Sequence, residues 1–283
     1  MPELPEVETI RAGLAPRLTG RVIHSLRIHT PTLRWPIPVQ QLEQSILGQT
    51  IRCVTRRGKY LLWTCGTGHV LIHLGMSGRL FTPDPLAPRQ RHDHVIWTLD
   101  DGSVIGLNDP RRFGAVLWIE GDWERHPLLA GLGPEPLEGD FHADHLFDRS
   151  RNRRVALQSW LMNARMVVGV GNIYAAESLF LAGLHPALPA GTLTRSHCAA
   201  LAEAVRRVLR AAIEQGGTTL RDYRQSDGRP GYFAVALRVY GRDGTPCPRC
   251  GTTIRRMRLG QRSAFYCPRC QPGPDSDPAE DQE

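Results

Sequence analysis

Four of the seven cysteines stand near the end of the chain in two closely spaced pairs. Two residues separate the members of each pair, and sixteen residues separate the pairs. Four thiolates at this spacing suit the tetrahedral coordination of a structural Zn²⁺ and leave no open position for a substrate. We therefore predict one structural Zn²⁺ per chain, the alternative being free or disulfide-bonded thiols. The predicted ligands are Cys247, Cys250, Cys267 and Cys270.

The segment between the two cysteine pairs is rich in arginine. Arg255, Arg256, Arg258 and Arg262 all lie there. Guanidinium groups bind phosphate oxygens without reading a base sequence. The predicted metal would then stiffen a hairpin whose tip presents positive charge to a phosphate backbone.

Lys59 is the only lysine among the 35 basic residues. An ammonium group is a compact charge that can gain and lose a proton, and a guanidinium group cannot replace it in that role. Lys59 is therefore a candidate catalytic residue, although a single lysine in an arginine-rich chain can also arise by accident.

The charge of the chain indicates the class of its partner. The formal net charge is +7, and removing the five acids of residues 272–283 raises it to +12. A basic excess favours a polyanionic partner, and nucleic acid fits better than a membrane because the sequence has no long apolar run and no signal-like segment. We expect a cytoplasmic protein without membrane association, the alternative being a basic soluble protein of another class.

The turn Gly169-Val170-Gly171-Asn172 resembles the start of a dinucleotide-binding fingerprint, but two features exclude that reading. The sixth position is Tyr174, where the fingerprint needs a small residue, and the turn joins two predicted helices. The backbone amides at a helix N-terminus can instead form a binding site for a phosphate. A glycine-rich packing turn is the alternative.

The first half of the chain combines one helix with short strands. Val7, Ile10, Leu14 and Leu18 have helical spacing after Pro5. Six short β-like runs follow, and an Asp-Gly pair at 101–102 predicts a hairpin, so we expect an antiparallel sandwich or a barrel-like domain. The predicted strands are 21–28, 60–64, 69–74, 94–99, 103–107 and 115–119.

The second half is predicted to be helical. Residues 127–148 are rich in proline, glycine and acids and indicate a linker. Gly216 and Gly217 end the last helix, residues 218–233 have the composition of a mobile loop, and the acidic tail is expected to be disordered. Cys53, Cys65 and Cys198 are expected to be small buried side chains in a reducing compartment. The predicted helices are 154–164, 173–182 and 201–215.

Several motifs taken together resemble the bacterial formamidopyrimidine-DNA glycosylases, which are also called 8-oxoguanine-DNA glycosylases. Each motif alone is weak or moderate evidence, but all of them occur in one order between Pro2 and Gln271. The motifs are residues 2–9 (PELPEVET), 57–61 (RGKYL), 73–78 (HLGMSG), 109–114 (DPRRFG), 169–174 (GVGNIY) and the cysteine hairpin.

The resemblance implies an α+β fold with several domains. An N-terminal antiparallel β-sandwich flanked by helices carries the catalytic residues, and a helical helix-two-turns-helix domain with a zinc-bound β-hairpin follows. We expect the catalytic domain at 1–126, a linker at 127–148, the helical domain at 149–236 with a lesion-recognition loop at 218–233, the four-cysteine zinc finger at 237–271 and a disordered acidic tail at 272–283.

The resemblance also implies an activity. The family removes 8-oxoguanine and formamidopyrimidines from duplex DNA during base-excision repair, and then cleaves the strand by β,δ-elimination. Removal of Met1 would leave Pro2 with a secondary amine, which attacks the sugar C1′ and forms a Schiff base. An α-amino group titrates near ~8, so part of it is neutral at physiological pH. The alternative is that Pro2 and Pro5 only shape the start of the helix.

Three further residues match catalytic positions of the family. Glu3 corresponds to the acid that protonates the opening deoxyribose ring, and Lys59 to the lysine that assists loss of the damaged base. Arg262 corresponds to the hairpin arginine that grips phosphates near the lesion and assists the last elimination. The competing possibility is that Lys59 itself forms the Schiff base.

A glycosylase must extrude the damaged nucleotide before it can attack it. Met76, Arg111 and Phe113 match the residues that fill the resulting gap, with Arg111 bonded to the orphaned cytosine. If they had no such role, Met76 and Phe113 would be core residues at strand ends. The residues matched to contacts with the DNA backbone are His92, Arg153 and Asn172.

The match has departures and leaves two rival functions. Gln158 and Asn163 stand where the family commonly has a lysine and an aspartate, and the acidic tail is an addition. The first rival is endonuclease VIII, which prefers oxidised pyrimidines, but Leu4 and the block 111–113 argue against it. The second is a zinc-dependent DNA-binding protein without catalysis. We expect a monomer that binds damaged double-stranded DNA and needs no small-molecule cofactor.

Overall fold

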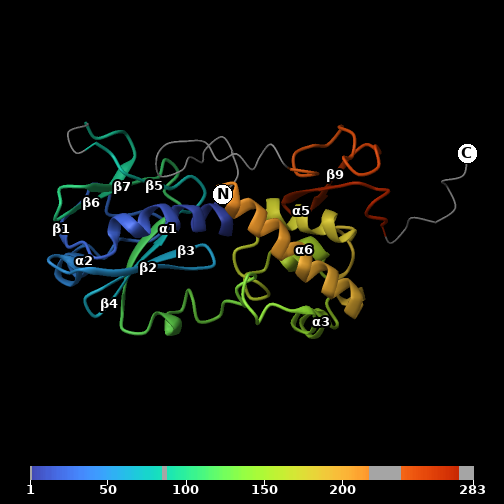
Figure 1. Cartoon of the computed structure of the whole chain (residues 1–283), viewed down its shortest axis with the longest axis horizontal. Coiled ribbons are helices and arrows are strands. Elements are labelled where there is room, and N and C mark those ends of the chain that lie inside the picture. The colour runs from blue at the N-terminus through green and yellow to red at the C-terminus, as the bar shows by residue number, and fades with distance from the viewer. Residues whose placement is uncertain (1, 85–87, 217–236, 274–283) are drawn as a thin grey trace, which may run out of the picture. The chain divides into compact units, whose positions relative to one another are not determined.

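The computed structural model describes residues 2–84, 88–216 and 237–273 (Figure 1). The chain divides into two compact units. The first contains the described residues up to Gly131 together with 212–216, and the second contains Leu132–Ala211 and 237–273. The motifs quoted from the N-terminal half belong to the first unit, and the cysteine hairpin belongs to the second.

The first unit is built on two antiparallel four-stranded sheets, which confirms the predicted sandwich. One sheet has the order β1-β6-β7-β5, and the other has the order β2-β3-β4-β8. The first sheet consists of β1 (Ile23–Ile28), β6 (Asp93–Leu99), β7 (Val104–Asn108) and β5 (Arg79–Phe81). The second consists of β2 (Ile51–Arg57), β3 (Tyr60–Cys65), β4 (Gly68–His73) and β8 (Ala115–Glu120).

The core of the first unit joins the two sheets. Trp63 of β3 and Trp97 of β6 meet edge to face with ring centroids 4.9 Å apart, and both are fully buried. Aliphatic residues from both sheets and from the first helix belong to the same buried cluster. Aromatic side chains of this size each remove about 150–250 Å² from water, so the pair contributes strongly to holding the sheets together.

Two helices accompany these sheets. Helix α1 (Leu4–Leu18) begins where the sequence predicted, buries Val7, Ile10 and Leu14, and packs against β2 and β3 (Figure 1). Helix α2 (Val39–Ile46) was not predicted, because only Leu42 and Ile46 of its residues are apolar and buried. The predicted hairpin at Asp101–Gly102 is confirmed, with Gly102 at φ +81° between β6 and β7.

The strand predictions missed β2 and β5. Strand β2 shows no alternation, because its buried Ile51 and Val54 stand three positions apart across a register shift and its other residues include Arg52, Arg56 and Arg57. Strand β5 has three residues, which is too short for a periodic pattern. The prediction that Cys53 is buried is also wrong, because this side of β2 is exposed, whereas Cys65 and Cys198 are buried as expected.

The second unit contains four helices and a small hairpin within its described residues. The helices are α3 (Ala143–Ser150), α4 (Leu157–Leu161), α5 (Asn172–Ala182) and α6 (Arg195–Glu214), whose last residues belong to the first unit. The hairpin consists of β9 (Arg255–Leu259) and β10 (Arg262–Tyr266), and β10 lies against α5. Single 3₁₀ turns occur at Trp123–Arg125 and Ala190–Thr192.

Several boundaries in this half differ from the predicted ones. The helix expected at 154–164 is confined to α4, because the chain turns after Met162. Helix α3 begins inside the predicted linker 127–148 and buries Leu146, and α6 begins earlier than expected at Arg195. The predicted loop 218–233 and residues 274–283 of the tail lie outside the described residues. Among the described ranges, the structure has no helix long and apolar enough to span a membrane.

Candidate active site and zinc centre

The start of α1 places Pro2 and Glu3 in a fixed geometry. Glu3 is the N-cap residue of the helix, and its backbone amide donates to Oε2 of Glu6 at 2.8 Å. Pro2 is buried, and the exposed fractions of Glu3 and Glu6 are only 3% and 2%. Carboxylates in the first turn are favoured by the positive end of the helix dipole. The sequence therefore places an acid directly beside Pro2 on a rigid element.

The turn that carries Lys59 is joined to the same helix by an ion pair. Gly58 and Lys59 form the two-residue turn between β2 and β3, with Gly58 at φ +55°. Arg56 donates from Nη1 to the carbonyl oxygen of Gly58 at 3.0 Å, and its Nε lies 3.0 Å from Oε2 of Glu8 on α1. Helix α1 and the lysine turn are thus linked within the first unit.

Glu8 accepts hydrogen bonds from two arginines. Arg11 Nη2 lies 2.7 Å from Oε1 of Glu8, and Arg56 binds the other oxygen. Burial raises the pKa of Glu8, but the hydrogen bonds from Arg11 and Arg56 outweigh it and hold the pKa below its ordinary value. Glu8 is therefore ionised at neutral pH, and its charge strengthens the link between helix α1 and the turn that carries Lys59.

His73 lies next to this turn and is held in its neutral form. It ends β4, its ring lies 4.9 Å from the ring of Tyr60, and its Nδ1 accepts from the amide of Gly75 at 3.0 Å. Burial, together with the nearby charges of Lys59 and Arg34, lowers the pKa of His73 to about 4. The ring therefore adds no positive charge near Lys59 at physiological pH.

Met76, Arg111 and Phe113 lie on two loops of the first unit and point into solvent. The exposed fractions of Met76 and Phe113 are 38% and 44%, and Arg111 is also exposed. The guanidinium carbon of Arg111 lies 5.0 Å from the centre of the Phe113 ring. The alternative that Met76 and Phe113 are core residues is wrong, because both are among the exposed large apolar side chains of the described residues.

The two loops are linked through a buried carboxylate to which the sequence assigned no role. Asp109 is fully buried, and its two oxygens accept from the Ser77 hydroxyl and the Gly114 amide, each at 2.8 Å. His92 precedes β6 in a left-handed conformation (φ +74°), and its carbonyl oxygen accepts from the amide of Asp109 at 3.1 Å. The only sequence signal for this link was that Ser77 and Asp109 each lie inside a quoted motif.

Asn172 in the second unit is fixed by two hydrogen bonds. It is the first residue of α5, after Gly171 at the N-cap. Its Oδ1 accepts from Nε2 of Gln158 at 2.8 Å, and its Nδ2 donates to the carbonyl oxygen of Ser263 at 2.9 Å. Ser263 follows Arg262 on β10, so Asn172 and Arg262 are brought together through the backbone of the hairpin.

Gln158 and Arg153 lie in different surroundings of the same unit. Gln158 is 2% exposed, and its buried Oε1 has no hydrogen-bond partner among the described residues. Arg153 is exposed and lines a hollow of about 350 Å³ together with Arg149 and Arg165. Three guanidinium groups around one hollow suit a phosphate better than an apolar ligand.

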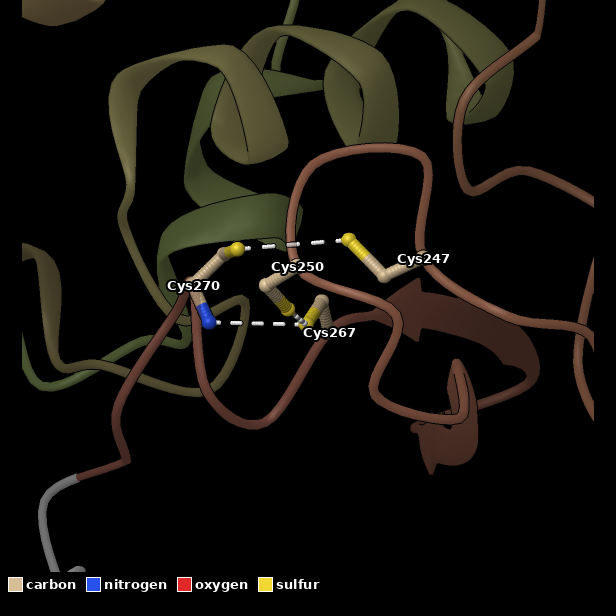
Figure 2. Close-up of side chains that lie close together, drawn as sticks. All are labelled: Cys247, Cys250, Cys267 and Cys270. Carbon is tan, nitrogen blue, oxygen red and sulfur yellow. Dashed lines mark hydrogen bonds between the residues drawn. The ribbon is translucent and has the colours of Figure 1, made fainter.

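The four predicted cysteine ligands converge (Figure 2). All their sulfur atoms lie within 4.8 Å of one another, with Cys247 and Cys270 at 3.9 Å and Cys250 and Cys267 at 3.4 Å. Zn–S bonds of about 2.3 Å in a tetrahedron require sulfur atoms roughly 3.8 Å apart. Backbone amides also donate to the sulfur atoms of Cys247 and Cys267 at 3.4 Å. The described residues therefore fit a structural Zn²⁺, and none of their cysteines forms a disulfide.

The cysteine hairpin is anchored to α5 by a residue that the sequence reasoning missed. Glu177 is fully buried, and its carboxylate accepts from the backbone amides of Arg238, Val239 and Tyr240, each at 2.9 Å. Glu177 is the only charged residue of the mainly apolar α5, and that isolation was the available signal.

Each unit thus contains its own share of the predicted site residues. The first holds Pro2, Glu3, Lys59, Met76, His92, Arg111 and Phe113, and the second holds Arg153, Asn172, Arg262 and the four cysteines.

Family models match three parts of the chain. The formamidopyrimidine-DNA glycosylase N-terminal domain matches residues 1–116, and the H2TH domain of the same family matches residues 132–224. A zinc finger found in FPG and IleRS matches residues 244–273. The three matches follow one another in the order expected from the motifs.

Curated relatives and solved structures agree with these matches. The chain is 53% identical over 273 residues to the formamidopyrimidine-DNA glycosylase of Magnetococcus marinus, covering 96% of this chain and 99% of the relative. It is 55% identical over 271 residues to that of Thioalkalivibrio sulfidiphilus, covering 96% and 100%. Among solved structures, a point mutant of Lactococcus lactis FPG in complex with a Fapy-dG containing DNA has a TM-score of 0.89 at 33% identity, covering 96% and 100%. The MutM (FPG) protein from Thermus thermophilus has a TM-score of 0.86 at 39% identity, covering 95% and 98%.

Proposed function

The chain belongs to the formamidopyrimidine-DNA glycosylase family, and from that premise we propose which of its own residues carry out each step of the reaction. It is a base-excision-repair glycosylase that acts on oxidised purines in DNA and has the AP-lyase activity typical of the family. The observation that carries the residue assignment is the fixed start of α1, where Glu3 lies buried beside Pro2 and is linked to the Lys59 turn through Glu8 and Arg56.

Pro2 is the nucleophile of this proposal once Met1 has been removed. Its neutral nitrogen bonds to C1′ of the damaged nucleotide, while the bond from C1′ to the base breaks and the base leaves with a proton. Glu3 donates a proton to the ring oxygen as the bond between C1′ and that oxygen opens, which leaves an iminium on Pro2. The β- and δ-eliminations then release the two phosphates from the sugar.

Lys59 and Arg262 assist the charged steps. The Lys59 ammonium compensates negative charge that develops as the base leaves, and the Gly58 turn holds it in place. Arg262, at the start of β10, binds the phosphate near the lesion and stabilises the last leaving group. Zinc, when bound to the four cysteines, cross-links the hairpin that carries Arg262.

The remaining site residues bind DNA in this proposal. Met76 and Phe113 fill the space that the extruded nucleotide leaves, and Arg111 bonds to the orphaned cytosine. Their exposure on two loops supports this role. The residues that bind the backbone are His92, Arg153 and Asn172.

The domain organisation and the working state are also proposals. We infer a catalytic domain at 1–126, a linker at 127–148, a helical DNA-binding domain at 149–236, a zinc finger at 237–271 and a tail at 272–283. The protein acts as a cytoplasmic monomer on nucleoid DNA without a small-molecule cofactor, because one chain supplies every side chain that the reaction uses. Light scattering of the purified protein, with and without a lesion-bearing duplex, tests the monomer.

Borohydride trapping tests the nucleophile. Two preparations, one without Met1 and one that retains it, are incubated with an 8-oxoguanine:cytosine duplex and borohydride, and the adduct is mapped by mass spectrometry. We expect an adduct on Pro2 in the first preparation and a loss on the order of 10³-fold or more in the second.

A Lys59→Met variant is the matched control for the competing nucleophile, because the chain has no other lysine. We expect slower trapping that still maps to Pro2. An adduct on Lys59 in the unmodified protein would refute the assignment. A parallel duplex with thymine glycol separates this enzyme from endonuclease VIII, since we expect faster excision of 8-oxoguanine.

A further inference from the structure

The two loops with exposed side chains are connected by one continuous series of hydrogen bonds. We call residues 74–78 and 109–114 the loop pair. The Gly114 amide donates to Oδ2 of Asp109 at 2.8 Å, and Oδ1 of Asp109 accepts from the Ser77 hydroxyl at 2.8 Å. The oxygen of that hydroxyl in turn accepts from the Arg111 amide at 3.2 Å. A single carboxylate and a single hydroxyl thus bind both loops.

Each of the three proposed gap-filling side chains lies at or beside a member of this series. Met76 precedes Ser77, Phe113 precedes Gly114, and Arg111 contributes its own amide. Phe113 and Arg111 also contact each other, with the guanidinium carbon 5.0 Å from the ring centre. A shift of Asp109 would therefore move all three side chains.

The backbones of the loop pair meet too closely to slide freely. Gly75 has φ +60°, and a Cβ atom there would lie 2.3 Å from the carbonyl carbon of Phe113. A Cβ atom on Gly114 would lie 2.8 Å from the carbonyl oxygen of His73 and 3.0 Å from Oδ2 of Asp109. Only glycine permits these approaches, so the series of bonds acts on two segments already in contact.

Asp109 is itself held by the neighbouring sheet. Its amide donates to the carbonyl oxygen of His92 at 3.1 Å, and its carbonyl oxygen bonds with Nε2 of His94 at 2.8 Å and with the Arg112 amide at 3.2 Å. The other ring nitrogen of His94 bonds with the Thr30 hydroxyl at 2.9 Å. The backbone of Asp109 is therefore held in place at the end of the strand pair β6 and β7, and the position of the carboxylate is fixed with it.

We propose that Asp109, acting through Ser77, is the positioning residue that sets the selectivity of this enzyme for the base opposite the lesion. The inference rests on the proposed roles of Met76, Arg111 and Phe113. A cytosine is distinguished from an adenine only if the Arg111 guanidinium stands at a fixed place, because hydrogen bonds to base edges depend on direction. The buried carboxylate fixes that place before DNA binds.

The chemistry of the series explains why a carboxylate is needed. The Asp109 side chain accepts two hydrogen bonds, one from a hydroxyl and one from an amide, and donates none. An ionised carboxylate suits this position because it has acceptors and no donor. In an Asp109→Asn variant, the side-chain NH₂ group would face either the Gly114 amide, which is a donor, or the Ser77 hydroxyl. Either arrangement breaks the direction of the series while it preserves shape and volume.

The test compares excision of 8-oxoguanine opposite cytosine and opposite adenine with cleavage of a single-stranded abasic site, which has no opposite base. The variants are Asp109→Asn, Ser77→Ala, Ser77→Thr and Arg111→Ala. We expect Asp109→Asn and Ser77→Ala to lower kcat/KM opposite cytosine about tenfold and to reduce the cytosine-to-adenine ratio by a similar factor. Cleavage of the single-stranded site should change less than about twofold, and Ser77→Thr, which keeps the hydroxyl, should restore the ratio.

The outcomes separate this inference from the proposed function. If Arg111→Ala keeps the ratio, the role of Arg111 fails, and the role of Asp109 fails with it. If Arg111→Ala loses the ratio but Asp109→Asn and Ser77→Ala keep it, only the present inference is overturned. An equal loss on all three substrates would show a merely structural role and would also overturn it. Ser77→Ala removes one hydroxyl and decides the matter if Asp109→Asn does not fold.

Discussion

The loop pair and the cysteine hairpin both hold exposed side chains in place and both use a buried carboxylate, but only the hairpin adds four cysteines that fit a metal. The loop pair is held by a buried carboxylate that accepts two hydrogen bonds from residues distant in the sequence. The hairpin is held by four thiolates, by the neutral amides of Gln158 and Asn172, and by the buried Glu177 carboxylate that binds the backbone just before it. A small segment with little core of its own gains stability from a metal, whereas the loop pair rests on the core of the large sandwich. The comparison indicates that substitutions in the first unit should alter the rate of the reaction and its selectivity. Substitutions or zinc removal in the second unit should alter DNA affinity.

Removal of zinc should produce the largest effect and should separate the two regions most sharply. A chelator frees the thiolates, and the hairpin that carries Arg262 loses its cross-link. We expect DNA affinity, measured by fluorescence anisotropy, to fall by about 10–100-fold, while calorimetry shows an unchanged unfolding transition of the first unit. An unchanged affinity in chelator would contradict this picture, and an Arg262→Ala variant calibrates the loss of one phosphate contact.

Acid should destabilise the first unit through His73. Its folded-state pKa of about 4 lies below the ordinary 6.5, so the unfolded chain binds the proton more readily. The neutral His73 ring contributes its full share to the free energy of unfolding above pH 6.5. That share is lost as the pH falls to about 4, and the total loss is up to about 3 kcal/mol. Urea unfolding at several pH values measures this, and a His73→Gln variant should lose less stability across that window. Equal pH dependence in both proteins would exclude His73 as the cause.

Loss of the ion pair at Glu8 should have a moderate effect on the first unit. Glu8→Gln weakens the bond to Arg56, whose side chain is only 11% exposed. We expect the free energy of unfolding to fall by about 1–2 kcal/mol and borohydride trapping to slow a few-fold. Because the folded pKa of Glu8 is lowered, this stabilisation is present above pH 4.5 and disappears as the pH falls below it.

The matched control is Asp144→Asn, which breaks an exposed pair with Arg195 in the second unit. We expect it to cost less than about 1 kcal/mol and to leave trapping unchanged. A larger loss in free energy of unfolding for Asp144→Asn than for Glu8→Gln would contradict the prediction that the less exposed ion pair stabilises the fold more.

The smallest effect is expected at Gln158. A Gln158→Met variant removes the bond to Oδ1 of Asn172 without changing charge, and should weaken DNA binding by about 2–10-fold. Because no cation is lost, the slope of log affinity against log salt should stay the same, whereas Arg262→Ala should reduce it by about one. A changed slope in Gln158→Met would show that the amide acts on more than Asn172.

The sequence predicted those parts of the fold that local patterns encode. Short β-like runs identified most strands of the sandwich, and cysteine spacing identified the zinc ligands. Strand β2 escaped because its arginines interrupt the pattern, and α4 was overextended because the chain turns where apolar residues continue. The bond between Ser77 and Asp109 spans 32 positions, and no local pattern predicts such a contact. Gln158 was noted as a departure from the family, but its bond to Asn172 required the folded chain.

The absence of a side chain at Gly75 restricts how the two loops can change over generations. A single methyl group there would occupy the space of the Phe113 carbonyl carbon, so most replacements at position 75 would require the distant segment to be rebuilt in the same step. Natural variants that alter the gap-filling residues are therefore expected to keep the backbone paths of both loops and to exchange only the projecting side chains.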